Sequence, residues 1–124
     1  MPAVEVTYSD HRADLVLKRP EVLNAMNWEV FEGLAAATDE IAARDDVRVV
    51  VVSGAGRSFC SGIDTASFGT LTGDPDQMIA VAQSGFRRLA SLAMPTIARI
   101  HGHALGAGLQ LALACDLRVV AGDA

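Results

Sequence analysis

The feature that most constrains the fold is a run of valines near the middle of the chain. Residues 47–52 read V-R-V-V-V-V, and Arg48 is the one polar residue among them. β-Branched side chains favour strands, and an apolar run without alternation implies burial of both faces. The run therefore predicts an inner strand of a parallel or mixed sheet rather than a hairpin strand with one solvated face.

Strands and helices alternate around this central strand. Short apolar or alternating runs predict a hairpin over residues 4–8 and 13–17 and two further strands over 96–101 and 117–121. Apolar residues at helical spacing predict three helices, from a cap at Asn27 to about residue 44, over about 76–92, and over 105–115. Loops are expected over 19–24, 53–57 and 67–76. The alternation predicts an α/β fold, with one domain over residues 1–124.

The composition excludes several classes of protein. The chain has 124 residues, 51% of them hydrophobic, which suits one domain with a core and argues against disorder. The net charge is −5 and Lys18 is the only lysine, so no nucleic-acid partner is expected. Cys60 and Cys115 are too few for a disulfide scaffold, and no apolar run is long enough to span a membrane. Residues 1–10 lack the pattern of a signal peptide, so we expect a cytoplasmic protein.

Two glycine-rich segments follow predicted strands, and core packing does not require so many glycines there. Residues 58–64 read S-F-C-S-G-I-D, and residues 102–108 read G-H-A-L-G-A-G. Small residues let a ligand approach the main chain, and a helix starting near Gly106 points free N–H groups outward. Such N–H groups can hold a phosphate or a developing negative oxygen.

Two other interpretations of these segments stay open on spacing alone. Residues 106–111 begin like the dinucleotide-binding turn G-x-G-x-x-G, but Leu111 replaces the third glycine. The chain also leaves no room for the acidic residue expected about 20 positions further on. The second alternative is structural, in which the glycines serve tight turns and close helix–strand packing.

Four motifs together resemble the enoyl-CoA hydratase/isomerase family, the crotonases. Residues 59–64, F-C-S-G-I-D, resemble the family segment F-C-A-G-x-D. Residues 101–112, H-G-H-A-L-G-A-G-L-Q-L-A, resemble G-x-x-x-G-G-G-x-E-L-A, and residues 115–121, C-D-L-R-V-V-A, match its continuation. Arg19-Pro20 and residues 23–26, L-N-A-M, match the opening motif R-P-x-x-L-N-A. Each motif alone is weak, but their order and spacing agree along the whole chain.

The resemblance implies a crotonase-like spiral of repeated β-β-α turns and an acyl-CoA thioester as substrate, with no separate cofactor and no metal. It implies an oxyanion hole of two backbone N–H groups, which by position are those of Ile63 and Ala107. The substrate is then expected against Ser61, Gly62, Ile63, Asp64, Thr65, Gly106 and Ala107. Members of the family are longer, so the resemblance also implies a chain truncated before the C-terminal helical region. For the full-length protein it implies a trimer-based homo-oligomer.

The acid–base residues depart from the family pattern. The family's hydratases carry a glutamate where this chain has Gln110. A glutamine amide has no titratable proton, so Gln110 can orient water or a thioester group but cannot be a general base. The family's second acid would lie beyond Ala124. The structural alternative is that Gln110 is a helix residue satisfied by neighbouring backbone.

Other candidate residues have simpler structural interpretations. Asp64 is expected to order its loop, and Cys60 and Cys115 are expected to be buried, unreactive thiols. His101 and His103 lack acidic or cysteine companions at ligand spacing, so no metal site is expected.

Two functions of different classes follow from the sequence. The first is an enzyme of this family that hydrates an enoyl-CoA or shifts its double bond, through an enolate held by Ile63 and Ala107. The second is a non-catalytic fragment, or a protein that binds acyl-CoA or an oligomeric partner without turnover. Gln110 and the missing second acid favour the second function for this polypeptide.

Overall fold

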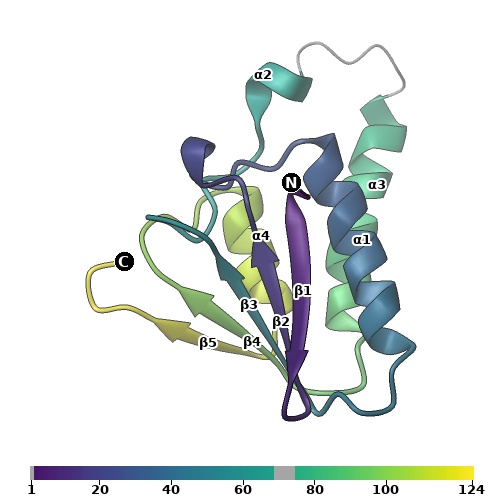
Figure 1. The fold of residues 1–124 in the computed structure, drawn as a ribbon. Coiled ribbons are helices and arrows are strands. Elements are labelled where there is room, and N and C mark those ends of the chain that lie inside the picture. Colours follow the sequence, from purple (N-terminus) through teal and green to yellow (C-terminus); the bar gives the residue numbers. More distant parts are fainter. Residues whose placement is uncertain (1, 69–74) are drawn as a thin grey trace.

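The computed structural model describes residues 2–68 and 75–124 (Figure 1). Five strands form one sheet: β1 (Val4–Ser9), β2 (Arg12–Leu17), β3 (Val49–Gly54), β4 (Thr96–Ile100) and β5 (Leu117–Val120). Their order in the sheet is their order in the sequence. The loop expected over 67–76 lies mostly outside the described residues.

The first two strands form the predicted hairpin. β1 and β2 pair antiparallel, and the chain reverses at Asp10 and His11, whose φ angles are 48° and 66°. Left-handed φ values at both central residues suit the twist of a two-residue hairpin turn. From β2 onward every neighbouring pair is parallel, so each later connection crosses over the sheet.

The valine run forms an inner parallel strand, as predicted. β3 lies between β2 and β4 and pairs in parallel with both. Val50 and Val52 are fully buried, and Val51, which points to the opposite face, is 8% exposed. The strand begins two residues later than predicted, because its ladder starts where Val49 pairs with Arg12.

The helices differ from the prediction in three places. They are η1, a 3-10 helix (Pro20–Val22), and the α-helices α1 (Trp28–Ala42), α2 (Thr65–Phe68), α3 (Pro75–Ala90) and α4 (Ala107–Ala114). η1 occupies part of an expected loop, and α2 was not expected at all. α4 begins two residues late because Leu105 still pairs with the segment at Cys60 and because Gly106, with a φ of 53°, is outside the helical conformation. The cap at Asn27 is confirmed, since its Oδ1 accepts the N–H of Val30 at 3.0 Å.

A second set of backbone contacts repeats from one crossover to the next. Met26, after β2, pairs in parallel with Ile63, after β3. Cys60, also after β3, pairs in parallel with Ala104, after β4. Each turn of the chain therefore contains a strand, a short extended segment and a helix. This arrangement confirms the expected spiral of β-β-α turns.

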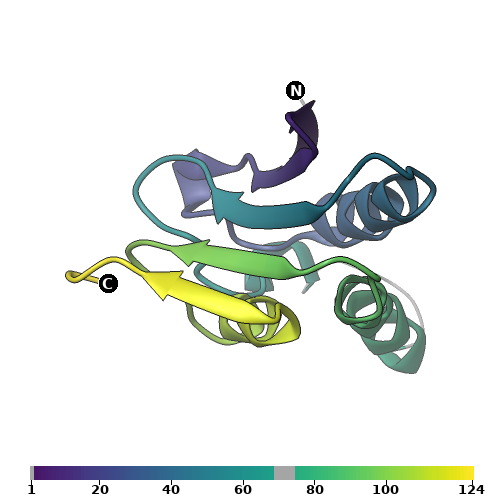
Figure 2. The same cartoon turned by 90° about the horizontal axis from the view of Figure 1, so that it is seen from below.

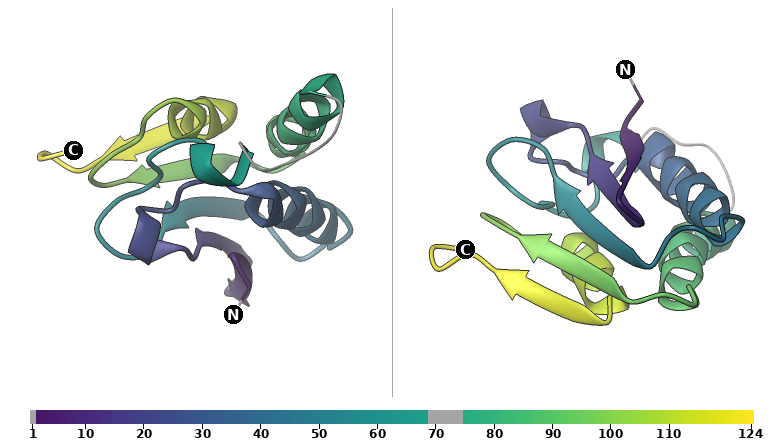
Figure 3. Two further views of the ribbon diagram at one scale, coloured as in Figure 1. Left: turned by 90° about the horizontal axis from the view of Figure 1, so that it is seen from above. Right: turned by 60° about the horizontal axis from the view of Figure 1, so that its bottom comes forward.

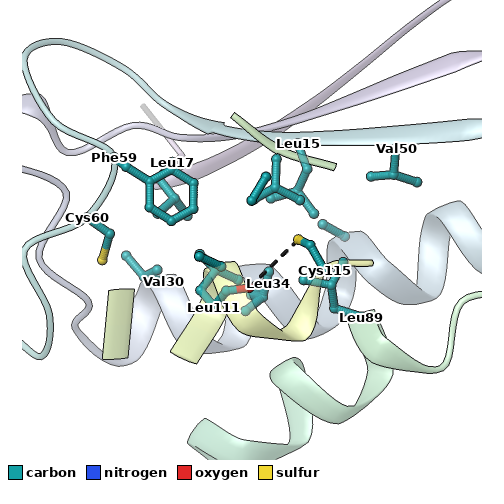
Figure 4. Close-up of a cluster of buried hydrophobic side chains, with 14 of the residues drawn as sticks. Leu15, Leu17, Val30, Leu34, Val50, Phe59, Cys60, Leu89, Leu111 and Cys115 are labelled. Atoms are coloured by element: carbon teal, nitrogen blue, oxygen red, sulfur yellow. Dashed lines mark hydrogen bonds between the residues drawn. The ribbon is translucent and has the colours of Figure 1, made fainter. Parts of the chain in front are cut away.

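The core lies between the sheet and the helices. α1 and α3 run side by side, and α4 contacts α3 and lies against the part of the sheet formed by β4 and β5 (Figures 2 and 3). Fully buried aliphatic and aromatic side chains from the strands meet those of the helices and of the segment after β3 (Figure 4): Leu15, Leu17, Val30, Leu34, Val50, Phe59, Leu89 and Leu111. At about 2 kcal/mol for each buried side chain, this layer supplies most of the stabilisation of the fold.

The last strand forms an edge of the sheet and is exposed. β5 pairs with β4 only, and Leu117, Val119 and Val120 are each 57% to 60% exposed. No helix in the described part of the chain is long and apolar enough to cross a membrane.

Candidate functional site

The two glycine-rich segments lie against each other at the same end of the sheet. The Cys60 N–H donates to the His103 carbonyl at 2.9 Å, and the Leu105 N–H donates to the Cys60 carbonyl at 3.1 Å. These bonds place Gly62 beside the start of α4. A Cβ atom on Gly62 would lie 3.1 Å from the Leu105 oxygen and 3.9 Å from the Ala107 nitrogen.

The two backbone N–H groups expected from the sequence at the thioester oxygen, those of Ile63 and Ala107, lie at this junction. In the part of the chain that the structure describes, the N–H groups of Ile63 and Ala107 donate to no backbone carbonyl. The residues that follow them differ, because Asp64 donates to Met26 at 3.0 Å and Gly108 donates to Leu105 at 2.8 Å. Ala107 is also the first residue of α4, where the helix dipole favours negative charge.

Glycine is required on both sides of the junction for two different reasons. Gly62 has a φ of 114° and Gly106 a φ of 53°, which side chains rarely tolerate. Gly108 has an ordinary φ, but a Cβ there would collide with the Cys60 carbonyl oxygen. The glycines therefore allow α4 to approach the other turn.

The remaining residues expected at the substrate lie around the same turn. Ser61 is half-buried, and its hydroxyl donates to the Val22 carbonyl at 3.4 Å. Thr65 is exposed at the start of α2. Asp64 forms an ion pair with Arg19, with Oδ2 3.1 Å from Nη1, which fits the expectation that it orders its loop.

Gln110 lies one helical turn after Ala107. The two residues are three positions apart on α4 and so share a side of the helix. The Gln110 side chain is exposed, and its backbone N–H donates to the Gly106 carbonyl at 3.1 Å. An exposed amide at this position remains available to a ligand or to water.

Four exposed apolar side chains surround the junction. Val22, Ile63, Leu105 and Leu109 are each 40% to 54% exposed. We call this set the apolar rim. It provides hydrophobic surface next to the two backbone donors.

Arg19 and Asn24 are structural residues of the site that sequence reasoning recognised only as parts of a motif. Asn24 is buried, and its Nδ2 donates to the carbonyls of Ala55 at 2.9 Å and Ser58 at 2.8 Å. Its φ of 56° is a conformation that asparagine tolerates better than most residues. A polar residue between Leu23 and Ala25 was the available signal, but only the fold shows which carbonyls it satisfies.

Both cysteines are buried, as expected. Desolvation raises the pKa of Cys60 above its ordinary value and raises that of Cys115 to about 11. The ring of His101 lies against the Gly56 carbonyl, with 2.7 Å between Nε2 and the oxygen, and His103 is exposed. Among residues 2–68 and 75–124, no group of three or more His, Cys, Asp or Glu side chains is placed to hold a metal ion.

Comparison with known proteins gives a consistent picture. A family model described as enoyl-CoA hydratase/isomerase matches residues 12–124. The protein named "Probable enoyl-CoA hydratase echA6" of Mycobacterium leprae is 38% identical over 124 residues, which are 98% of this chain and 49% of the relative. The chain thus spans about half the length of the curated relatives it matches.

Solved structures agree with the sequence comparison. The crystal structure of an enoyl-CoA hydratase/carnithine racemase from Magnetospirillum magneticum is similar, with a TM-score of 0.89 and 33% identity, over 97% of this chain and 46% of the other. A Thermobifida fusca protein in complex with acetoacetyl-CoA has a TM-score of 0.85 and 35% identity, over 97% of this chain and 51% of the other. The spiral fold, the motifs in their order and the match over residues 12–124 show that this chain belongs to the enoyl-CoA hydratase/isomerase family.

Proposed function

We propose that this protein binds coenzyme A thioesters of acyl chains and acts on an enoyl-CoA by hydration or by a shift of its double bond. The observation that carries the proposal is the pair of N–H groups of Ile63 and Ala107, which donate to no backbone carbonyl of the described residues and belong to two turns that meet although they are far apart in the sequence. Two backbone donors that hold the same atom suit an oxygen that becomes negatively charged.

The thioester oxygen is the atom that these donors would hold. In hydration, the oxygen of water bonds to the β-carbon and loses one proton to an acceptor, while the electron pair of the double bond moves onto the α-carbon and the thioester oxygen. The resulting enolate then takes a proton at the α-carbon, so that one water is added overall. Because the oxygen carries more charge in the enolate than in the substrate, the N–H groups of Ile63 and Ala107 stabilise the enolate more than the ground state.

The surroundings of the donors support an acyl-CoA ligand. The apolar rim offers hydrophobic surface for an acyl chain. The similar Thermobifida fusca protein was solved with acetoacetyl-CoA, which is a thioester of this class. Ser61, Gly62, Asp64, Thr65 and Gly106, which border the two turns, complete the proposed binding surface.

A second candidate function is acyl-CoA binding without turnover. The specific observation that favours it is Gln110, whose exposed amide can orient water or the thioester but cannot accept its proton. Water needs such an acceptor as it adds to the β-carbon. Under this second function the same donors and the apolar rim serve recognition alone.

Two measurements on the purified chain test these functions. The first is hydration of crotonyl-CoA, followed by loss of the enoyl absorbance. The second is thermal protection by a saturated acyl-CoA, which cannot react. Protection with turnover supports the enzyme, and protection without turnover supports the binding protein. If acyl-CoA neither binds nor protects, both functions are contradicted.

We also propose that the protein assembles into a trimer-based homo-oligomer and works in the cytoplasm, as family resemblance implies. The exposed apolar residues of α4 and β5 support an assembly, because such surfaces are usually covered. Light scattering coupled to size-exclusion chromatography tests the assembly, and a monomer at every concentration contradicts it.

A further inference from the structure

Arg19 connects the peptide segments on either side of the Ile63 N–H group. Its Nη1 donates to the Ala25 carbonyl at 2.5 Å and lies 3.1 Å from Oδ2 of Asp64. Ala25 precedes Met26, and Asp64 follows Ile63. Met26 and Ile63 pair with each other in a short bridge. The same guanidinium nitrogen therefore contacts Ala25, which is next to Met26, and Asp64, which is next to Ile63.

The Met26–Ile63 bridge determines the direction of the Ile63 N–H. The Met26 N–H donates to Gly62 at 2.8 Å, and the Asp64 N–H donates to Met26 at 3.0 Å. In a parallel pair, the residue between two such bonds points its own N–H away from the partner segment. A displacement of Met26 relative to Asp64 would therefore rotate the Ile63 donor.

The main chain of Arg19 is fixed to the same loop. Its N–H donates to Oδ1 of Asn24 at 2.8 Å, and its carbonyl accepts the Asn24 N–H at 2.9 Å. Asn24 is in turn bonded through its side chain to Ala55 and Ser58, next to β3. The guanidinium thus reaches Asp64 from a firmly held backbone.

The Arg19–Asp64 pair is more buried than the other ion pairs of the described residues. Its side chains are 19% and 17% exposed, compared with 42% and 25% for Arg12–Asp14. Exposed pairs contribute little, whereas a largely buried pair is screened less by solvent and interacts more strongly. The Asp64 carboxylate of this pair lies one residue from the proposed donor to the thioester oxygen.

We infer that Arg19 is a positioning residue for acyl-CoA chemistry. By bridging the Ala25 carbonyl and the Asp64 carboxylate, it holds the Ile63 N–H toward the thioester oxygen. Its positive charge also lies 3.1 Å from the Asp64 carboxylate and reduces the repulsion between that carboxylate and the developing negative charge. The inference rests on the proposed function, in which the Ile63 N–H is an oxyanion donor.

The first test needs no ligand. Amide hydrogen exchange by NMR is compared for the wild type, Arg19→Met and the matched ion-pair control Arg12→Met. Loss of the bridge should speed exchange at the Met26 and Asp64 amides by about tenfold or more in Arg19→Met alone. Equal exchange at these amides in all three proteins overturns the inference. If Arg19→Met does not fold, Asp64→Asn replaces it, with the same expected result.

The second test uses butanoyl-CoA, a saturated thioester, and infrared spectroscopy of its thioester carbonyl. The wild type should lower the carbonyl stretching frequency on binding. Arg19→Met should lose about half of that shift or more, while its dissociation constant changes by less than about threefold. Arg19→Lys keeps the charge but not the planar guanidinium, and its carbonyl shift should lie between those of the wild type and Arg19→Met. A role in folding alone would change the melting temperature or the affinity and leave the carbonyl band unchanged.

The outcomes of the second test distinguish the inference from the proposed function. A wild-type shift that persists in full in Arg19→Met overturns the inference and leaves the proposed function standing. A wild type that does not bind butanoyl-CoA, or binds it without a shift, contradicts the proposed function itself and removes the inference with it.

Discussion

At the scale of single residues, the Ala107 N–H can be removed with little other change. Ala107 is the first residue of α4, the one helical position that proline suits well. We expect Ala107→Pro to keep the helix but weaken enolate stabilisation by about 3 kcal/mol, with a matching loss of any turnover. Ala107→Ser keeps the N–H and is the control. Turnover of crotonyl-CoA, or the infrared band of a bound thioester, measures the effect. An unchanged band in a folded Ala107→Pro protein would argue against Ala107 as a donor.

Tyr8 reports on the packing of β1 against α1. Its hydroxyl donates to Oε2 of Glu40 at 2.7 Å, and the Arg44 guanidinium lies 3.7 Å from the ring centroid. Desolvation, followed by the hydrogen bond and charge of Glu40, raises the pKa of Tyr8 to about 12. In the unfolded chain the Tyr8 hydroxyl ionises near pH 10. The contribution of Tyr8 to the stability of the folded protein is therefore complete below that pH and is lost as the pH rises toward about 12.

Absorbance titration measures this pKa directly, because Tyr8 is the only tyrosine. We expect a native midpoint near 12, and a lower midpoint in Glu40→Gln. Glu32→Gln, an exposed change on the same helix, should leave the midpoint in place. A native midpoint near 10 would show that the contact with Glu40 is absent in solution.

The two thiols should be unreactive in the folded protein. The Cys60 thiol lies 3.2 Å from the Asn24 carbonyl, and the Cys115 thiol lies 3.7 Å from the Leu111 carbonyl. Burial and a raised pKa both reduce the reactive thiolate near pH 8. We expect almost no reaction with Ellman's reagent in buffer and full reaction of both thiols in urea. Rapid modification of either thiol in the native state would contradict this burial.

At the scale of elements, Arg118 connects β5 to the end of α4. Its Nη1 donates to the carbonyls of Ala112 at 3.2 Å and Cys115 at 3.0 Å. Carbonyls at a helix C-terminus lack partners within the helix and attract cations. We expect Arg118→Ala to lower the free energy of unfolding by about 1–2 kcal/mol in urea titrations. Arg99→Ala, an exposed change on β4, is the control and should cost about 0.5 kcal/mol or less. If the two changes lower the free energy of unfolding equally, Arg118 does not stabilise the end of α4.

Element boundaries show where sequence patterns are weak predictors. The 105–115 helix was predicted from its composition, but Leu105 is bonded to Cys60 and the helix starts at Ala107. Similarly, the valine run was recognised as a strand, but β3 starts only where β2 provides a partner at Arg12. Composition indicates which element forms, whereas a partner distant in the sequence determines where it begins or ends.

At the scale of the whole molecule, the outer sides of α4 and β5 carry an uncovered apolar surface. Its members are all large, apolar and at least 47% exposed: Leu109, Leu113, Leu117, Val119 and Val120. An exposed edge strand with apolar side chains readily pairs with other chains. We expect the apparent mass in light scattering to rise with concentration and Val119→Lys to reduce that rise. Ile79→Lys, at an exposed position on α3, should not reduce it. Association unaffected by Val119→Lys would place the contact elsewhere.

The sequence by itself determined the class of fold, the order of the elements and the two turns where chemistry was expected. It could do so because strand and helix propensities, turn residues and glycine requirements are local properties. That the side chain at position 110 is an amide without a titratable proton was also visible from sequence alone, since this property of glutamine does not depend on its surroundings.

Only the tertiary structure decided how those local features meet. Ile63 and Ala107 are 44 positions apart, and it is the Cys60–Ala104 bridge that brings their turns together. The same holds for Arg19 and Asp64, which are 45 positions apart and meet beside the Met26–Ile63 pair. Contacts of this kind follow from how the crossovers wind around a shared core, and propensities confined to neighbouring residues carry no information about them.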